Sequence, residues 1–474
     1  MPDRQVVIAE EIPAPLREGL ARLRQSLNVP DEFPADVLAA ASAAVERQTL
    51  PEADATQIDF VTIDPPGSLD LDQAVHIRTE GAGYVVSYAI ADVGAFVQPG
   101  DPVDLEAHRR GQTFYAPTRR TPLHPEVLSE GATSLLPDQV RPALLWELHL
   151  DATGECAGAS VRRARVRSRR RLSYDQAQAA LDAGTADDLL LLLRTVGQLR
   201  EQLEVDRGGV SLGVPEQEVH AQGEHWELSY RTPLPVEGWN AQISLLTGMA
   251  AAKLMLGAGV GVLRTLPPAD PGAIRRLRQT ARALHIPWPD QQDYPDFVRS
   301  LDPSVHTHAA MLNACTTLFR GAGYVAFDGG APEQALHAAL AASYAHCTAP
   351  LRRLVDRYVG EVCLAICAGT PVPDWVRAAL PGLAPDMEES NRRVKKYERG
   401  IVDLVEALVL SPHLGEAFAG TVIEADTERG DGTLQLNEPA VQARVTGAGL
   451  KLGADLTATL TAADVTTGNV RFKA

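Results

Sequence analysis

The sequence has few cysteines, and their arrangement argues against two common kinds of cross-link. Only five occur in 474 residues, the number is odd, and no two form a Cys-x-x-Cys motif. We therefore expect neither a disulfide framework nor a zinc site, and the predicted location is the cytoplasm. The five are Cys156, Cys315, Cys347, Cys363 and Cys367.

Long hydrophobic runs are also scarce. Residues 1–13 include acidic residues and no apolar run long enough for a signal peptide. Residues 241–263 are apolar for most of their length, but Gln242, Lys253 and several glycines interrupt them. We expect a buried core helix here rather than a membrane span, so a membrane is not among the expected partners. Nothing in the sequence implies an organic cofactor or an oligomeric partner.

Positive charge is in the minority. The chain has 44 Lys and Arg against 61 Asp and Glu, a net charge of −17. This argues against a surface coated with positive charge for unspecific nucleic-acid binding, but leaves room for a local basic channel. The composition, 45% hydrophobic and 22% charged, is ordinary for a globular protein, and the length suggests about three domains.

Residues 1–56 are predicted to form a small helical unit. Leucines repeat at helical spacing from Leu16 to Leu27, prolines then interrupt the pattern, and a second helical pattern runs from Val37 to Val45. A helix-turn-helix-like module that binds RNA is one interpretation. Two helices packed on the next domain are the alternative.

The rest of the chain is predicted to be a large α+β domain followed by a small barrel. Residues 84–97 are rich in β-branched and aromatic residues and predict a strand, whereas helical patterns occur later, around 236–256, 335–342 and 351–368. We place this domain at 57–413. In 414–474, five short strand candidates separated by turns fit an OB-type barrel, a fold that often holds single-stranded nucleic acid. The candidates are 418–423, 434–437, 441–445, 456–460 and 470–472.

Three carboxylates lie close together in residues 62–74, TIDPPGSLDLDQA. Pro65, Pro66 and Gly67 predict a tight loop between Asp64 and the other two acids. Asp70 and Asp72 are two residues apart, so in an extended segment they point the same way. Carboxylates without histidine or cysteine favour magnesium or manganese. A solvated acidic loop is the alternative.

Four segments resemble the ribonuclease II/R superfamily and its RNB catalytic domain. The segment 62–74 is similar to the family signature TIDPxxxxDxDDA, and 344–356, YAHCTAPLRRLVD, is similar to Y-x-H-x-T-[SA]-P-[IL]-R-R-x-x-D. The segment around Tyr115 resembles a Y-x-P stretch with a proline-flanked turn, and MEESNRRVKKYERG falls where the family has a helix with E…ER. The resemblance extends over 57–413, and the C-terminal barrel lies where the family has an RNA-binding OB domain.

The resemblance implies a processive 3′→5′ exoribonuclease that hydrolyses single-stranded RNA to nucleoside 5′-monophosphates with Mg²⁺, for which Mn²⁺ could substitute. Two such ions, held by carboxylates, can activate water and neutralise the reacting phosphate. The implied metal ligands are Asp64, Asp70 and Asp72, with Gln73 as a ligand of second rank. Asp72 matches the family acid thought essential for cleavage.

The resemblance also implies several RNA-binding residues. Arg352 would hold the scissile phosphate through its planar fork, so we count it with Asp72 as catalytic. Tyr115 would stack on the terminal base, and Glu389 would lie on the RNA path, with Glu398 in the same helix. For Arg353, contact with RNA and a salt bridge to Asp356 are equally open.

Two basic runs and one histidine have two interpretations each. Residues 161–172 carry seven arginines in twelve residues, either along an RNA path or, slightly favoured, on a solvated strand that offsets surplus acids. For His346 a structural hydrogen bond is as plausible as catalysis, and Cys363 with Cys367 suggests core packing. The second run shares a predicted helix with Glu389, so contact with RNA is more plausible there. Its members are Arg392, Arg393, Lys395, Lys396 and Arg399.

The sequence departs from the family pattern in three places. Gln73 replaces a fourth acid, Arg264-Thr265-Leu266 lacks the histidine of an arginine-x-histidine element, and two N-terminal cold-shock barrels have no counterpart. A more open entrance to the channel is then expected, so stems with a single-stranded 3′ tail should also be degraded. The alternative function, suggested by Gln73, is a catalytically weakened or silenced RNA-binding protein. A hydrolase of DNA or small phosphoesters would leave the C-terminal barrel unexplained.

Overall fold

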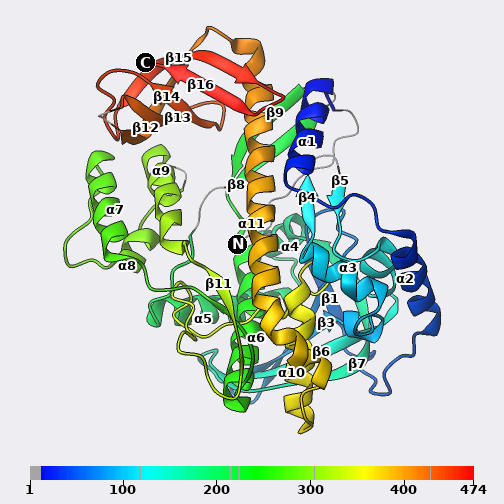
Figure 1. The fold of residues 1–474 in the computed structure, drawn as a ribbon. Helices are drawn as coiled ribbons and strands as arrows, with labels where there is room; N and C mark the ends of the chain where they lie inside the picture. The colour runs from blue at the N-terminus through cyan, green and yellow to red at the C-terminus, as the bar shows by residue number, and fades with distance from the viewer. Residues whose placement is uncertain (1–11, 117–118, 213–215, 223–224, 304, 427–428) are drawn as a thin grey trace.

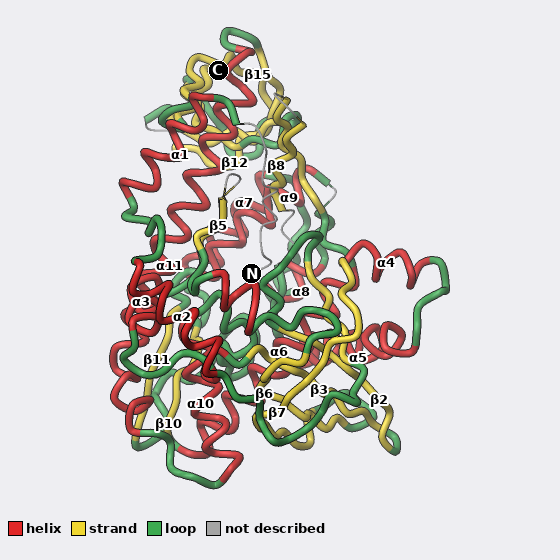
Figure 2. The backbone as a smooth tube through the Cα atoms, turned by 90° about the vertical axis from the view of Figure 1, so that its right-hand side faces the viewer, coloured by secondary structure: helices red, strands yellow, loops and turns green. Residues whose placement is uncertain are grey.

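The computed structural model describes residues 12–116, 119–212, 216–222, 225–303, 305–426 and 429–474 (Figure 1). Two closed five-stranded barrels lie at opposite ends of the molecule, and the long helix α11, Asp374–Leu410, runs between them (Figures 1 and 2). The mixture of helices and strands agrees with the α+β class predicted from the sequence.

The first barrel has the strand order β1-β2-β3-β6-β7 and is closed by parallel pairing of β1 with β7. Alternate residues of each strand serve two cores: Tyr88 and Ile90 pack towards helices, whereas Ala89 and Ala91 belong to a separate cluster. The strands are β1 Phe60–Asp64, β2 Gln73–Glu80, β3 Gly83–Ala91, β6 Val140–Leu150 and β7 Cys156–Ser173.

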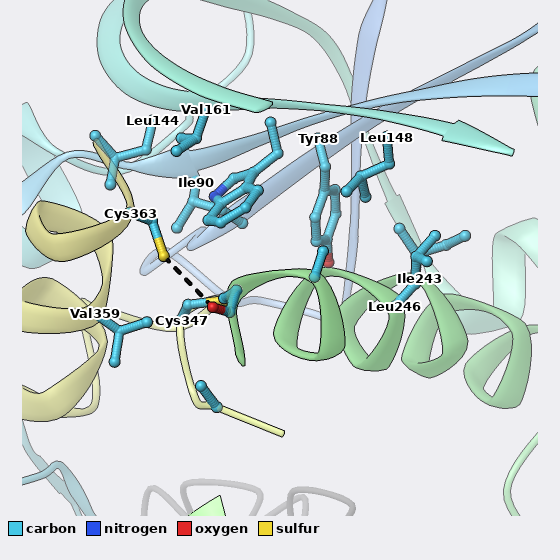
Figure 3. Close-up of a cluster of buried hydrophobic side chains, with 14 of the residues drawn as sticks. Tyr88, Ile90, Leu144, Leu148, Val161, Ile243, Leu246, Cys347, Val359 and Cys363 are labelled. Carbon is cyan, nitrogen blue, oxygen red and sulfur yellow. Dashed lines mark hydrogen bonds between the residues drawn. The ribbon is translucent and has the colours of Figure 1, made fainter. Parts of the chain in front are cut away.

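Helices cover the barrel face that carries Tyr88. Figure 3 shows Tyr88 and Leu148 of the barrel facing Ile243 and Leu246 of α6, with Val359 and Cys363 of α10 beside them. Cys363 is thus a core residue, as the sequence suggested, and all five cysteines are free thiols. The helices of this region are α4 Tyr174–Asp182, α5 Asp188–Asp206, α6 Pro235–Ala258 and α10 Leu354–Ala368.

The apolar stretch 241–263 is divided between a helix and a strand. Helix α6 ends at Gly259, whose φ of 72° is left-handed and favours glycine, and β10, Val260–Thr265, follows and pairs with β11, Gly323–Asp328. Within the described residues, α6 has the length and composition to cross a membrane, but half of its most apolar window is buried inside the protein. The predicted core helix is therefore present, but it begins six residues earlier, at Pro235, and ends before Gly259.

The prediction of a helix at 335–342 is wrong. This segment forms turns and isolated bridges, in which His337 pairs with Leu266 and with Ala342. The alanine-rich pattern reflects burial of Ala339 and Leu340 at the end of β10, because backbone groups here bond to neighbouring segments instead of along a helix. The strand expected at 84–97 ends at Ala91 and continues as a short 3-10 turn, Val93–Ala95.

The two N-terminal helices have no core of their own. Helix α1, Ala14–Ser26, packs on α11, and its Leu16 and Leu20 share a cluster with the C-terminal barrel. Helix α2, Ala35–Arg47, packs on α3, Pro102–Arg110, and joins the cluster of the first barrel. The arrangement is thus that of two helices packed on the rest of the protein. The domain boundary at residue 56 stays a prediction.

The C-terminal barrel contains all five segments predicted as strands. Its order is β12-β13-β14-β16-β15, with β14 parallel to β16. Its apolar interior continues into the end of α11, through Val405 and Leu410. The strands are β12 Ala417–Asp426, β13 Asp431–Leu436, β14 Gln442–Thr446, β15 Asp455–Asp464 and β16 Asn469–Lys473.

The remaining elements connect these parts. Figure 1 shows α7, α8 and α9 at one side of the molecule beneath the C-terminal barrel, whereas β4 with β5 lies close to α11. They are β4 Phe114–Ala116, β5 Arg119–Thr121, the π-helical turn η2 Val127–Ala132, β8 Glu216–Gln222, β9 His225–Arg231, α7 Pro271–Ala283, α8 Tyr294–Arg299 and α9 His306–Cys315.

Candidate active site

The acidic loop joins β1 to β2 and is fixed by the segment that follows η2. The Leu71 N–H donates to Ser134 Oγ over 2.9 Å, and the Leu135 N–H donates to the Leu71 carbonyl over 3.0 Å. Leu71 is fully buried. Because side chains alternate in extended chain, Asp70 and Asp72 both turn away from the core that holds Leu71.

Asp72 is the most buried of the three acids, with 5% of the residue exposed. Its Oδ1 accepts from the Leu351 N–H over 2.8 Å, and its Oδ2 lies 3.5 Å from Nε of Arg352. Burial raises the pKa of Asp72 well above its usual value, Arg352 and the Leu351 N–H oppose the shift, and Asp70 adds to it. The structure thus brings Asp72 and Arg352 together, as the resemblance implied.

The turn that carries Arg352 is built around Asp356. The buried Asp356 carboxylate accepts from the Ala349 N–H over 2.7 Å and from both Nε and a terminal nitrogen of Arg353 over 2.9 Å. Of the two interpretations of Arg353, the structure contains the salt bridge. The Thr113 N–H donates to the Arg352 carbonyl over 3.0 Å, which ties this turn to the strand of Tyr115.

Gln73 links the first barrel to the same turn. Its Nε2 donates to the Thr348 carbonyl over 2.7 Å, and its Oε1 accepts from the Tyr88 hydroxyl. Burial raises the pKa of Tyr88 well above its usual value, so the hydroxyl keeps its proton and acts as the donor. The sequence suggested a metal ligand of second rank here, whereas the structure shows an amide engaged at both ends.

Tyr115 is connected to the acidic loop through its hairpin partner, Arg120. In the β4–β5 ladder, Tyr115 is directly opposite Arg120, so both side chains occupy one face. One terminal nitrogen of Arg120 lies 2.8 Å from Asp70 Oδ1 and the other lies 2.9 Å from Glu130 Oε1. The sequence reasoning missed Arg120 and Glu130, and only the position of Arg120 in the Tyr115 segment could have suggested the former.

Glu389 is not part of this cluster in the structure. It is exposed on α11 and pairs with Arg392. The next residues, Ser390 and Asn391, contact the side chain of Gln112, so α11 does run past the Tyr115 strand.

The basic run 161–172 is mostly neutralised by neighbouring acids, as the favoured interpretation stated. Five of its arginines form ion pairs within the described residues. The pairs are Arg162 with Glu147, Arg163 with Asp92 and Glu361, Arg165 with Asp54, Arg169 with Asp59, and Arg170 with Asp187.

His346 has a structural hydrogen bond. Its Nδ1 lies 2.8 Å from the Tyr324 hydroxyl, and burial, with Arg353 and Arg264 nearby, lowers the pKa of His346 well below its usual value. A neutral imidazole in this position serves packing and hydrogen bonding.

The carboxylates suit a hard cation in chemistry but are not assembled around a single point. Among the residues that the structure describes, no three His, Cys, Asp or Glu side chains are already gathered into a metal-binding cluster. Asp70 and Asp72 instead face Arg120 and Arg352. Asp64 and Asp72 both contribute to the raised pKa of Tyr88, so they share its surroundings. Oxygen donors of this kind are those that Mg²⁺ and Mn²⁺ prefer.

Comparison with known proteins gives the family to which this fold belongs. Residues 52–367 match the RNB domain, and residues 416–474 match the RNase II-type exonuclease C-terminal S1 domain. The chain therefore belongs to the RNB-domain exoribonuclease family.

Individual relatives agree with this assignment. Ribonuclease R of Escherichia coli is 26% identical to this chain, in a match that covers 80% of this chain and 50% of the relative. The chain spans half or less of the length of the first curated relatives that it matches. The structure of Mycoplasma genitalium RNase R in complex with ribose methylated single-stranded RNA superposes with a TM-score of 0.86, 20% identity, and coverage of 97% of this chain and 78% of that one. The structure of yeast Ssd1, a pseudonuclease, superposes with a TM-score of 0.70 and 14% identity, and the match covers 90% of this chain and 55% of that one.

Proposed function

We propose that this protein is a 3′→5′ exoribonuclease that releases nucleoside 5′-monophosphates from single-stranded RNA. The observation that carries the proposal is the buried Asp72 carboxylate, which lies 3.5 Å from the Arg352 guanidinium at the junction of the acidic loop and the 344–356 turn. An acid and a guanidinium so placed can act together on one phosphodiester.

Three acids are the proposed ligands of a divalent metal, Asp64, Asp70 and Asp72. Exoribonucleases with this domain generally depend on a divalent metal. When bound, it would supply an activated water and a counter-charge for the reacting phosphate. Gln73 is better explained as the link between Tyr88 and the Thr348 carbonyl, so we leave it out of the proposed ligand set.

Arg352 is proposed to hold the scissile phosphate. A guanidinium has five N–H donors in a planar fork, so one that faces Asp72 through Nε can also bind phosphate oxygens. Asp356 positions it, because this carboxylate binds both the Ala349 N–H and the Arg353 side chain at the base of the turn. Arg353 then serves the shape of the turn and does not itself contact RNA.

Tyr115 is proposed to stack on the 3′-terminal base. The proposal is supported by the face of the β4–β5 hairpin that Tyr115 shares with Arg120, because Arg120 contacts Asp70. Stacking accepts any base, as a sequence-independent exonuclease requires. Glu389 remains a proposed contact farther along the RNA path, on the exposed side of α11.

The C-terminal barrel is proposed to hold the incoming strand. It matches an S1 domain, and the RNase R structure with the same fold has single-stranded RNA bound. Magnesium as the natural metal, processivity, degradation of stems with a 3′ tail and a cytoplasmic location are further parts of this proposal.

A catalytically weakened or silenced RNA-binding protein is the second candidate. Two observations favour it: the carboxylates of the described residues do not converge on one point, and Ssd1, with the same fold, is a pseudonuclease.

One experiment separates the two candidates. The protein is incubated with 5′-labelled single-stranded RNA and with DNA of the same sequence, with Mg²⁺ and with EDTA. Stepwise shortening of RNA alone, abolished by EDTA, supports the nuclease. Binding of RNA without shortening under every condition supports the silenced protein, and equal shortening of DNA contradicts both.

A further inference from the structure

Arg120 lies between two carboxylates that come from different segments. Its terminal nitrogens lie 2.8 Å from Asp70 Oδ1 and 2.9 Å from Glu130 Oε1. The side chains of Arg120, Asp70 and Glu130 are 25%, 17% and 18% exposed. At this burial the ion pairs are only partly screened by water, so they matter more than pairs on an open surface.

The segments that carry the two carboxylates are tied together. Glu130 lies in η2, and Ser134 and Leu135, shortly after that turn, bond to the backbone of Leu71 in the acidic loop. Arg120 comes from β5, a separate hairpin. Its flexible side chain can therefore shift its contacts from one carboxylate towards the other while all three backbones stay in place.

This arrangement affects the proposed metal ligand directly. A carboxylate that is already neutralised by a guanidinium attracts a cation less, and the lone pairs that face Arg120 must be released before they can ligate. Asp70 is in that condition. Glu130 offers the displaced guanidinium a second anionic partner, so the exchange would not leave a buried charge unpaired.

We propose that Arg120 competes with the divalent cation for Asp70 and that Glu130 retains the displaced guanidinium. The inference rests on the proposed role of Asp70 as a metal ligand. Arg120 is then a positioning residue that sets the cation concentration at which the site fills, and Glu130 is the residue that makes the exchange reversible.

Replacing Arg120 and replacing Glu130 should change the affinity for the cation in opposite directions. Arg120→Gln removes the competitor, so Mn²⁺ should bind roughly tenfold more tightly, the size of a partly buried ion pair. Glu130→Gln removes the alternative partner, so Arg120 holds Asp70 more firmly and Mn²⁺ should bind about threefold more weakly. In the Arg120→Gln background, Glu130→Gln should have little further effect.

The test is Mn²⁺ binding to the full chain without RNA, followed by the electron paramagnetic resonance signal of free Mn²⁺. Arg119→Gln is the matched control for Arg120, because this neighbour pairs with Asp31 instead. Glu126→Gln is the control for Glu130, because it is exposed just before the same turn. Both controls should bind Mn²⁺ like the wild type. Arg120→Lys, which keeps the charge but cannot bridge two carboxylates, should fall between Arg120→Gln and the wild type.

The outcomes separate this inference from the metal site on which it rests. Equal Mn²⁺ affinity in the wild type and Arg120→Gln, with loss of binding in Asp70→Asn, overturns the competition alone. Equal affinity in all three overturns Asp70 as a ligand as well. Thermal unfolding checks that each variant is folded, and if Arg120→Gln does not fold, weaker binding by Glu130→Gln supports the competition, whereas unchanged binding contradicts it.

Discussion

Replacing Gln73 by an acid tests whether its amide is a structural link or a place for a metal. The Nε2 of Gln73 donates to the Thr348 carbonyl over 2.7 Å, and its Oε1 accepts from Tyr88. In Gln73→Glu, an oxygen would face the Thr348 carbonyl, so one hydrogen bond is lost and two acceptors oppose each other. An unsatisfied buried acceptor costs about 1–3 kcal/mol, and a new charge near Asp72 adds to this.

We therefore expect Gln73→Glu to lower the free energy of unfolding by about 3 kcal/mol. Differential scanning calorimetry should show a fall of roughly 5 °C in the transition of the catalytic domain. Gln98→Glu is the matched control, since Gln98 is exposed, and its transition should be unchanged.

The family resemblance taken alone predicts the opposite for Gln73→Asp. A restored fourth acid would lower the Mg²⁺ concentration needed for half-maximal rate. From the structure we expect no such gain, because the shorter acid breaks the link to the turn of Arg352. A stable Gln73→Asp variant with a lower Mg²⁺ requirement would refute the structural role of Gln73.

Three further predictions concern the turn of Arg352, a buried histidine and the C-terminal barrel. Asp356→Asn and Arg353→Gln should each lower the free energy of unfolding, measured with urea, by about 3 kcal/mol. The double variant should lose less than the sum of the two, and additive losses would contradict the ion pair. Burial lowers the pKa of His124 to about 3, so below about pH 6.5 the unfolded chain takes up a proton that the folded protein does not, and stability falls. His124→Gln should therefore lose less stability than the wild type between pH 7 and 4. Parallel curves of stability against pH for the two proteins would refute this. Arg444 and Arg471 are exposed neighbours on β14 and β16. Replacing both by Gln should weaken binding of long RNA and reduce the slope of log affinity against log salt concentration by about 1.4, whereas an unchanged slope would place the RNA elsewhere.

Local pattern was sufficient for much of the fold. The five strands of the C-terminal barrel alternate clearly between turns, and the buried helix α6 follows from an apolar stretch with Gly259 at its end. Short windows were less reliable. Residues 335–342 have the composition of a helix, but their backbone bonds to β10 and to nearby turns, which a local pattern does not reveal.

The candidate site was predictable only where the sequence resemblance reached. Asp72 and Arg352 lie together although 280 positions separate them, and the motif suggested both. The partners of Asp70 and Gln73 come from other segments: Arg120 contacts Asp70 and is itself paired with Glu130, and Tyr88 reaches Gln73 from the neighbouring strand. Likewise, nothing in the spacing of α1 and α2 shows that they belong to two different cores.

The most direct test of the proposed function compares cleavage with binding in Asp72→Asn. The Asn Oδ1 can still accept from the Leu351 N–H, so the fold should be kept, and Asp59→Asn, an exposed acid beside β1, is the control. With a 5′-labelled RNA and Mg²⁺ under single-turnover conditions, we expect Asp72→Asn to cleave at least about a thousandfold more slowly while its affinity stays within about threefold of the wild type. Cleavage near the wild-type rate, or a wild type that binds the RNA and never shortens it, would contradict the assignment of Asp72 to the chemical step.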